Sequence, residues 1–580
     1  MTRRMFAPTP DQQSIIDHKF GAFVSACAGA GKTEVLVERA RRVLNNEKLG
    51  RGIAFLSFTN AAVDELGKRL QLANVLPSIP FPSFLGTFDR FLWHFFVQPL
   101  GIPGITCVPR LIVDKEQRSV RPSPKAQEIP LECFNRETGA FLAHKRRLHG
   151  VDPQDDPSLT QAYCQKALET QKQAMARGEL DFDDIRAVVK QQLTLNQEVR
   201  VLSRALSARF VEIIVDEAQD CNQSDIEILD WLRDEGIRVK VICDPHQSIF
   251  EFRGGVTDQL FALRSRFRVE DQLRISGNFR STPHICKVVS LFRSKDDDAP
   301  EDQALGRYRN EMTPIHLLEY GGNSVTAAIG AKAHQIVREH LGPVDLLPVL
   351  ATTKDAAAKA VGYPLDSETK GRTCTLAFAV TSFHTSTEAH DRGKAIDKIH
   401  RIVLELGDHL DGQSYHQYLA EKELEPGAWR PRIIRLARAM EYSAERFATP
   451  DAWLEHVRTV LSPFAAKGSS SIRRRLSNDK KLSQALAGKH PNGLTPRTIH
   501  SVKGLQFPAV CVVMPPRNTK AILDLLESGQ NKADGESLRK IYVAVSRAER
   551  LLVIAVPKSQ MTRVKARFAG AGVKLVEHKT

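Results

Sequence analysis

The sequence predicts an α/β protein built on parallel, doubly wound sheets. Short apolar segments of strand length, such as 21–25, 211–215 and 239–244, alternate with longer stretches whose apolar residues recur at helical spacing. Segment 211–215 is almost continuously apolar, as expected for a strand covered by helices on both faces. Strands that alternate with helices form parallel sheets, and such sheets bind ligands at the carboxyl ends of their strands.

Length and composition indicate a folded chain of several domains. At about 150 residues per domain, 580 residues predict roughly four units. No apolar run approaches the ~20 residues of a membrane span, and segment 1–8 lacks the apolar core of a signal peptide. Nine scattered cysteines without a C-x-x-C pair argue against a disulfide framework, a zinc site or an iron–sulfur cluster. We therefore expect a reduced, cytoplasmic protein with no membrane partner.

The charge balance favours a polyanionic partner. Lysine and arginine number 82 against 68 aspartates and glutamates, a formal net charge of +14. The densest basic run, 469–475 with Lys480 and Lys481 after it, suits either a solvated linker face or a track for phosphates. Net charge alone does not choose between nucleic acid and other anions.

The strongest local motif follows the first predicted strand. It reads Ala26-Cys27-Ala28-Gly29-Ala30-Gly31-Lys32-Thr33 and leads into a stretch with apolar residues at helical spacing. The backbone N–H groups of such a loop form an anion cradle at a helix N-terminus, although Ala26 stands where the motif usually begins with glycine. Lys32 would contact the β- and γ-phosphates of ATP, and Thr33 would ligate Mg²⁺. The expected nucleotide contacts are Ala28, Gly29, Ala30, Gly31, Lys32, Thr33 and Glu34.

An acidic motif, Asp216-Glu217-Ala218-Gln219-Asp220, follows the apolar segment 211–215. Asp216, at the carboxyl end of the predicted strand, would help to hold Mg²⁺. Glu217 would accept a proton from the attacking water. A surface turn is the alternative, but it does not explain why carboxylates follow a buried strand directly.

Further motifs occur along the chain in a fixed order. They are Thr9-Pro10-Asp11-Gln12-Gln13, Ser57-Phe58-Thr59-Asn60-Ala61-Ala62, Gly86-Thr87-Phe88, Leu180-Asp181-Phe182-Asp183-Asp184-Ile185, Gln247-Ser248-Ile249-Phe250, Phe252-Arg253-Gly254, Asn278-Phe279-Arg280-Ser281-Thr282, His500-Ser501-Val502-Lys503-Gly504-Leu505-Gln506-Phe507 and Tyr542-Val543-Ala544-Val545-Ser546-Arg547-Ala548. With the P-loop and the acidic motif, this series resembles superfamily 1 helicases of the UvrD/Rep/PcrA type. The resemblance extends from about residue 10 to residue 556.

The resemblance implies two RecA-like P-loop cores with ATP between them, each a parallel doubly wound sheet interrupted by a mainly helical inserted subdomain. We expect the first core at 1–88 and 206–279 and its insertion at 89–205. The second core would comprise 280–372 and 491–580, with a shortened insertion at 373–490. Trp429 and Trp453 are the expected core residues of that second insertion.

The resemblance also assigns roles at the nucleotide. Arg280 and Arg547 match the two arginine fingers of the family, and such residues supply about 10³–10⁵ in rate. Gln247 would sense the γ-phosphate. Phe279 would stack on adenine, Gln12 would read the edge of the adenine, and Gln506 would contact the ribose where the family usually has glutamate.

A second group of residues matches positions that contact single-stranded DNA in the family. Translocases stack bases on aromatic side chains, which is worth about 1–3 kcal/mol per base. The matching residues are Phe58, Thr59, Asn60, Thr87, Phe250, Phe252, Arg253, His500 and Lys503, of which Lys503 would couple the phosphate and DNA sites. Phe58 is equally compatible with a place in the core.

Two functions therefore remain open. The first is an ATP-dependent translocase or helicase that moves 3′→5′ on single-stranded DNA, or on DNA with a single-stranded end. The alternative is a DNA- and nucleotide-sensing regulatory subunit of a separate nuclease, because compact proteins of this type resemble the helicase-like component of Gabija-type anti-phage systems, whose partner is an OLD-family nuclease. The short second insertion puts strand separation in question, because that insertion gates duplex unwinding in the family.

Overall fold

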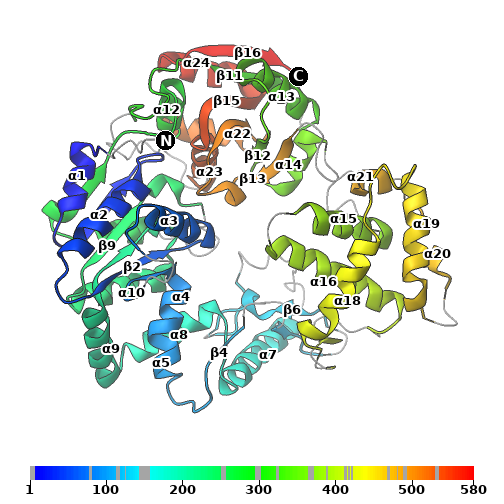
Figure 1. Ribbon diagram of the computed structural model, residues 1–580, viewed down its shortest axis with the longest axis horizontal. Helices are drawn as coiled ribbons and strands as arrows, with labels where there is room; N and C mark the ends of the chain where they lie inside the picture. Colours follow the sequence, from blue (N-terminus) through cyan, green and yellow to red (C-terminus); the bar gives the residue numbers. More distant parts are fainter. Residues whose placement is uncertain are drawn as a thin grey trace.

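The structure is a computed structural model of the 580-residue chain. It describes all residues except 1–6, 77–80, 113–117, 124–125, 137, 143–156, 250–256, 294–301, 322–324, 363–370, 387–388, 411–414, 416–417, 420–421, 423, 467–469, 480, 487–492 and 529–534. Two six-stranded sheets organise the molecule (Figure 1).

The first sheet has the strand order β10-β1-β9-β8-β2-β3, and all its neighbouring strands are parallel. Its strands are β1 (Ala22–Ala26), β2 (Gly52–Ser57), β3 (Phe84–Thr87), β8 (Phe210–Val215), β9 (Val239–Cys243) and β10 (Gln272–Ile275). Successive strand residues point to opposite faces: Phe23 joins the hydrophobic cluster on one side, and Val24 joins the cluster on the other. Helices cover both faces, namely α1 (Pro10–Asp17), α2 (Lys32–Asn46), α3 (Asn60–Leu72), α10 (Gln223–Asp234) and α11 (Thr257–Ser265).

The second sheet has the order β13-β12-β14-β15-β11-β16 and is also parallel. Its strands are β11 (Ile315–Tyr320), β12 (Leu347–Ala351), β13 (Leu494–Thr498), β14 (Phe507–Val513), β15 (Ala548–Pro557) and β16 (Leu575–Lys579). Its helices are α12 (Pro283–Leu291), α13 (Ala328–Leu341), α14 (Lys354–Val361), α22 (Thr519–Ser528), α23 (Gly535–Val545) and α24 (Met561–Gly570). The predicted α/β class with two parallel, doubly wound sheets is confirmed.

Between β3 and β8 the chain forms a mainly helical segment. Its helices are α4 (Phe88–Leu92), a π-helical turn (Trp93–Val97), α5 (Gln98–Leu100), α7 (Pro157–Ala176), α8 (Phe182–Gln192) and α9 (Asn196–Arg209). Two short strand pairs accompany them: β4 (Arg110–Leu111) with β7 (Glu179–Leu180), and β5 (Ser119–Val120) with β6 (Ile129–Pro130). The aspartates of the motif at 180–185 serve this fold, because Asp181 and Asp184 form a capping box on α8 and pair with the buried Arg118.

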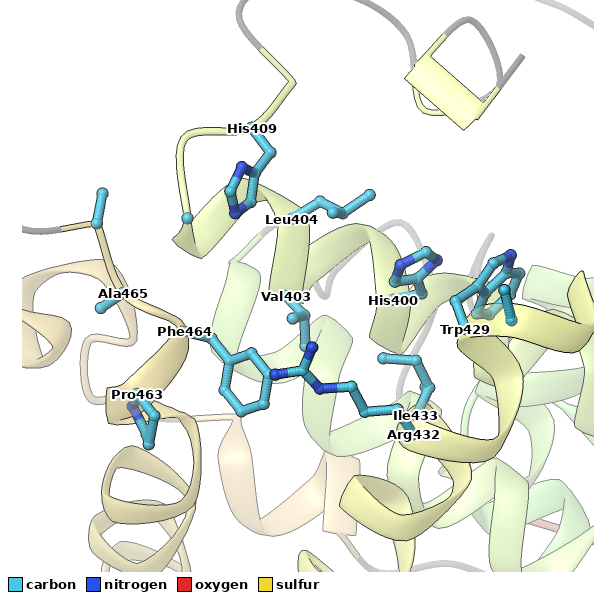
Figure 2. A pocket seen from close by; sticks show the side chains of 13 residues that line it. His400, Val403, Leu404, His409, Trp429, Arg432, Ile433, Pro463, Phe464 and Ala465 are labelled. Carbon is cyan, nitrogen blue, oxygen red and sulfur yellow. The ribbon is translucent and has the colours of Figure 1, made fainter. Parts of the chain in front are cut away.

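The described regular elements between residues 371 and 486 are helices. They are α15 (Arg372–Thr385), α16 (Ala389–Leu406), α18 (Pro426–Ala439), α19 (Pro450–Leu461), α20 (Ile472–Arg475) and α21 (Leu482–Leu486). Trp429 and Trp453 are buried in their common hydrophobic cluster, as predicted. A cavity of about 430 Å³ lies between α16, α18 and the segment after α19. In Figure 2, Arg432 extends toward Phe464 in this cavity, and His400 lies beside Trp429.

Candidate active site

The P-loop joins the carboxyl end of β1 to the first turn of α2. Gly29 and Gly31 have φ angles of 75° and 74°, in the left-handed region that only glycine adopts readily. A Cβ atom on Gly29 would lie 2.6 Å from Asn278 Oδ1, so no larger residue fits there. Lys32 begins α2, and Thr33 and Glu34 follow in the same turn. The loop is therefore suited to bind an anion at the N-terminus of α2.

Lys32 bridges the two predicted catalytic carboxylates. Its Nζ donates to Glu217 Oε1 at 2.8 Å and lies 3.9 Å from Asp216 Oδ1. Burial would lower the pKa of Lys32, but the charges of Glu217 and Asp216 outweigh burial and raise it. The pKa of Glu217 is lowered, because the charges of Lys32 and Lys503 outweigh the effect of burial. The pKa of Asp216 is raised, because for this carboxyl burial has the larger effect. Glu217 is thus held as a carboxylate.

The backbone of Glu217 is unusual, with a φ angle of 57° at a residue that has a Cβ atom. Its N–H donates to Asp216 Oδ1 at 2.9 Å, and its Oε2 accepts from the Gln219 side-chain amide. These contacts turn both carboxylates toward the P-loop at the end of β8. Non-glycine residues in this region of φ,ψ space persist where surrounding contacts hold them, often at functional sites.

Thr33 and Asp216 are a suitable pair for Mg²⁺. This ion takes hard oxygen ligands and is usually held by one or two carboxylates together with substrate phosphates and water. Thr33 provides a hydroxyl in the first turn of α2, and Asp216 provides a carboxylate directly after β8, 3.9 Å from Lys32 Nζ. Glu34, by contrast, is paired with Arg69 of α3. Among the described residues, no cluster of three or more His, Cys, Asp or Glu side chains is arranged to hold a metal.

The two residues expected at adenine both lie beside Gly31. A Cβ atom there would be 3.0 Å from Gln12 Nε2 and 3.6 Å from Phe279 Cδ2. Gln12 is completely buried and donates from Nε2 to the Ala30 carbonyl at 2.9 Å. Phe279 is half-buried, and its N–H donates to the Gly29 carbonyl at 2.8 Å. Both residues therefore bind the P-loop backbone directly.

The predicted arginine fingers are Arg280, between β10 and α12, and Arg547, between α23 and β15. Arg547 Nη2 donates to Gln247 Oε1 at 3.1 Å, and burial together with the neighbouring Arg280 lowers the pKa of Arg547 to about 9. Arg280 donates to Gln506 Oε1 at 3.0 Å and to the Ser546 carbonyl at 2.8 Å. The structure thus brings Gln247, Gln506 and both arginines together at the boundary between the two sheets.

Three further side chains tie the second sheet to the segment after β9. Lys503 Nζ pairs with Asp220 Oδ1 at 2.5 Å and donates to the Gln247 carbonyl at 3.0 Å. His500 Nε2 donates to the Ile249 carbonyl at 3.0 Å, and Arg539 Nε donates to the Ser248 carbonyl at 2.6 Å. Lys503 and His500, expected at DNA, therefore also bind the segment that carries Gln247.

The remaining predicted DNA contacts lie at the ends of β2 and β3. Phe58 is half-buried and stacks on Phe88, with ring centroids 5.5 Å apart. Thr59 and Thr87 cap helices α3 and α4 by accepting from backbone N–H groups, each at 3.2 Å, and Asn60 is exposed. Phe250, Phe252 and Arg253 lie outside the described residues.

Three residues at this boundary have no role assigned from the sequence: Asn278 and Tyr542, which stand in motifs of the series, and Asp244, which ends the predicted strand 239–244. Asn278 Oδ1 accepts from the backbone N–H groups of Arg280 and Ser281, and Asp244 and Tyr542 are joined by a hydrogen bond of 3.0 Å. Their positions beside Gln247, Arg280 and Arg547 were the available signal. In the basic run, Arg473 pairs with Glu455, and Arg475 pairs with Asp408.

Comparison with known proteins identifies the relationship. Residues 9–92 and 110–268 match the family model of the UvrD/REP helicase N-terminal domain, and these residues contain the P-loop, the acidic motif and Gln247. This N-terminal part of the chain is similar to the UvrD/REP helicase family, and relatives named DNA helicase II and PcrA match the chain as well. The expected family resemblance is therefore confirmed.

The relatives that the chain matches include proteins named as DNA helicases. A probable DNA helicase II homolog of Mycoplasma capricolum is 23% identical over 54% of this chain and 45% of its own length. DNA helicase II of Haemophilus influenzae is 25% identical over 47% of this chain and 38% of its own length. The alignment with ATP-dependent DNA helicase PcrA of Staphylococcus epidermidis, at 21% identity, covers 93% of this chain and 81% of PcrA. The chain thus spans less than half the length of the first two.

No helix in the described part of the chain combines the length and apolar character that crossing a membrane requires.

Proposed function

We propose that this protein is an ATP-dependent DNA translocase or helicase that moves 3′→5′ on single-stranded DNA and couples ATP hydrolysis between two cores to strand movement. The observation that carries the proposal is the hydrogen bond between Arg547 and Gln247, 3.1 Å long, at a boundary that also holds Lys32 and Glu217. A phosphate-binding loop on one sheet thereby faces an arginine from the other. Relatives named as DNA helicases support the same reaction.

The nucleotide would lie on the P-loop, with the boundaries of the cores as the sequence suggests: 1–88 with 206–279, and 280–372 with 491–580. Lys32 would exchange Glu217 for the terminal phosphates, which frees the carboxylate to accept a proton from water. Mg²⁺ held by Thr33 and Asp216 would neutralise charge on the phosphates. Arg280 and Arg547 would stabilise the charge that develops during transfer.

Coupling to DNA would run through the segment after β9. Gln247 meets the nucleotide side of the boundary, while the two residues after it, Ser248 and Ile249, accept hydrogen bonds from Arg539 and His500. Lys503 binds the Gln247 carbonyl and Asp220 together. A change at the phosphate would therefore move side chains of the second sheet. Phe58, Phe250, Phe252 and Arg253, with Thr59, Asn60 and Thr87, are the proposed DNA contacts.

The test is ATP hydrolysis by the purified chain alone, with single-stranded DNA and with blunt duplex DNA. We expect single strands to raise the turnover strongly, and duplexes with a 3′ single-stranded tail to be used in preference to those with a 5′ tail. Turnover that does not rise with single strands would overturn the translocase. Activation of a co-purifying nuclease without unwinding would instead support the regulatory subunit.

A further inference from the structure

A buried tyrosine joins the P-loop to the opposite sheet. Tyr542 lies on α23 with no exposed surface, and its hydroxyl donates to Asp244 Oδ2 at 3.0 Å. The same hydroxyl oxygen accepts from the backbone N–H of Ala28 in the P-loop, at 3.4 Å. Burial and the charge of Asp244 raise the pKa of Tyr542 well above its ordinary value, so the phenol keeps its proton.

Hydrogen bonds through Gln247 link Asp244 to Arg547, the predicted arginine finger. Its Oδ2 also accepts from Gln247 Nε2 at 2.7 Å, and Gln247 Oε1 accepts from Arg547 Nη2 at 3.1 Å. Asp244, Gln247 and Arg547 are 1%, 3% and 2% exposed, so water does not compete for these bonds. Tyr542 lies in the last turn of α23 (Gly535–Val545), and Arg547 lies two residues after the end of that helix.

The orientation of two side-chain amides depends on Asp244, one through its carboxylate and one through its backbone N–H. An ionised carboxylate only accepts hydrogen bonds, so Gln247 must turn its NH₂ group to Asp244 and its oxygen to Arg547. The Asp244 backbone N–H donates to Gln219 Oε1 at 3.0 Å, so the NH₂ group of Gln219 must face Glu217. Asp244 therefore orders the partners of both Glu217 and Arg547.

We propose that Tyr542 is a positioning residue that fixes Asp244, and through Gln247 holds Arg547 in the geometry that hydrolysis requires. The inference rests on the proposed ATPase function and goes beyond it, because Tyr542 is assigned no contact with nucleotide or DNA. Its hydroxyl accepts from the Ala28 N–H of the P-loop and donates to Asp244 after β9. Removing that hydroxyl leaves a buried carboxylate short of one donor while the apolar packing of the ring remains.

The test is Tyr542→Phe in the full chain, measured by DNA-stimulated ATP turnover, binding of a fluorescent ATP analogue with Mg²⁺, and thermal melting. We expect kcat to fall about tenfold, as the loss of one buried hydrogen bond to a charged group implies, with analogue Kd and melting temperature nearly unchanged. Tyr320→Phe is the matched control. Tyr320 is another buried phenol of the second sheet, and its hydroxyl donates to the Met514 carbonyl at 2.7 Å, away from the boundary.

A second variant tests the same hydrogen bonds by changing the acceptor, Asp244, instead of the donor, Tyr542. Asp244→Asn turns one acceptor into a donor, which then faces either the His246 N–H or the donors of Tyr542 and Gln247. We expect its kcat to fall at least as far as that of Tyr542→Phe. In a Gln247→Ala background, Tyr542→Phe should have much less effect, because the connection to Arg547 is already broken.

The outcomes separate the two claims. No ATP turnover by the wild-type chain with single-stranded DNA would overturn the proposed function and this inference together. An active wild-type chain whose kcat is unchanged by Tyr542→Phe would overturn only the inference. An equal loss in Tyr320→Phe, or effects of Tyr542→Phe and Gln247→Ala that simply multiply, would also overturn it.

Discussion

Lys32 Nζ and Glu217 Oε1 lie 2.8 Å apart, so the lysine expected to bind phosphate is bound instead to the carboxylate expected to activate water. Each residue holds the other in its charged state: Glu217 raises the pKa of Lys32, and Lys32 lowers the pKa of Glu217. A nucleotide phosphate would compete for the same ammonium. We therefore expect Glu217, the proposed base, to be released when a phosphate of the nucleotide binds Lys32.

Glu217→Gln should stop hydrolysis while leaving ATP binding intact. An amide still hydrogen-bonds to Lys32, but it cannot accept a proton from water, and loss of a general base costs about 10²–10⁴ in rate. Turnover and analogue binding measure the two effects separately. Glu235→Gln, at the end of α10, is the control and should change neither. Turnover near the wild-type rate in Glu217→Gln would assign the base to another residue.

Gly29→Ala should abolish nucleotide binding. The new methyl group would meet Asn278 Oδ1 at 2.6 Å, and the φ angle of 75° is strained for alanine. Gly50→Ala separates the two causes, because Gly50 has a φ angle of 67° with nothing within 4 Å of the added Cβ atom. We expect Gly50→Ala to lower stability by roughly 1 kcal/mol without changing binding. Equal binding losses in both variants would mean that strain, not the contact with Asn278, is responsible.

Lys503→Met should weaken the response to DNA more than it weakens basal turnover. The substitution removes a buried partner of Asp220 and a donor to the Gln247 carbonyl, both of which join the two sheets. We expect at least a tenfold loss of DNA stimulation, since breaking a buried ion pair costs about 3–5 kcal/mol. Lys558→Met, at an exposed position after β15, is the control. Undiminished stimulation would exclude Lys503 from the coupling.

The helical segment between residues 371 and 486 should become less stable as the pH falls below neutral. Burial lowers the pKa of His400 to about 4 from 6.5, so between these values the unfolded chain binds a proton that the folded chain does not. The contribution of His400 to the free energy of unfolding is therefore fully present above pH 6.5 and is lost as the pH falls toward 4. The loss from pH 6.5 to 5 should approach about 2 kcal/mol.

His400→Phe checks this pH dependence. Phenylalanine keeps a ring where His400 stacks on Trp429, 4.1 Å between centroids, but it does not titrate. Melting temperatures at pH 7.5 and pH 5 should differ less in the variant than in the wild type. His334→Phe serves as the control, since it removes a half-buried histidine of the second sheet's helices instead. An identical pH shift in wild type and His400→Phe would contradict the assignment.

The sequence predicted those features that depend on local chemistry. Apolar segments such as 211–215 became buried strands, and the glycines at 29 and 31 adopted the left-handed conformation that a P-loop needs. Partners from distant parts of the chain were beyond such reasoning. Lys503 meets Asp220 across 283 positions, and Tyr542 meets Asp244 across 298. Which pairs form depends on how the sheets meet, and spacing along the chain carries no record of that.

The pairing of β12 with β13 bears on how the sequences of related chains can change in length. They pair in parallel, Leu347 with Leu494, although α14 and the helices α15–α21 separate them in the chain. Everything between them leaves and re-enters at one edge of the sheet. Because the entropy of closing a loop grows only slowly with its length, material can be gained or lost there at little cost to the register. The nucleotide machinery and the size of its helical appendage are therefore free to evolve independently.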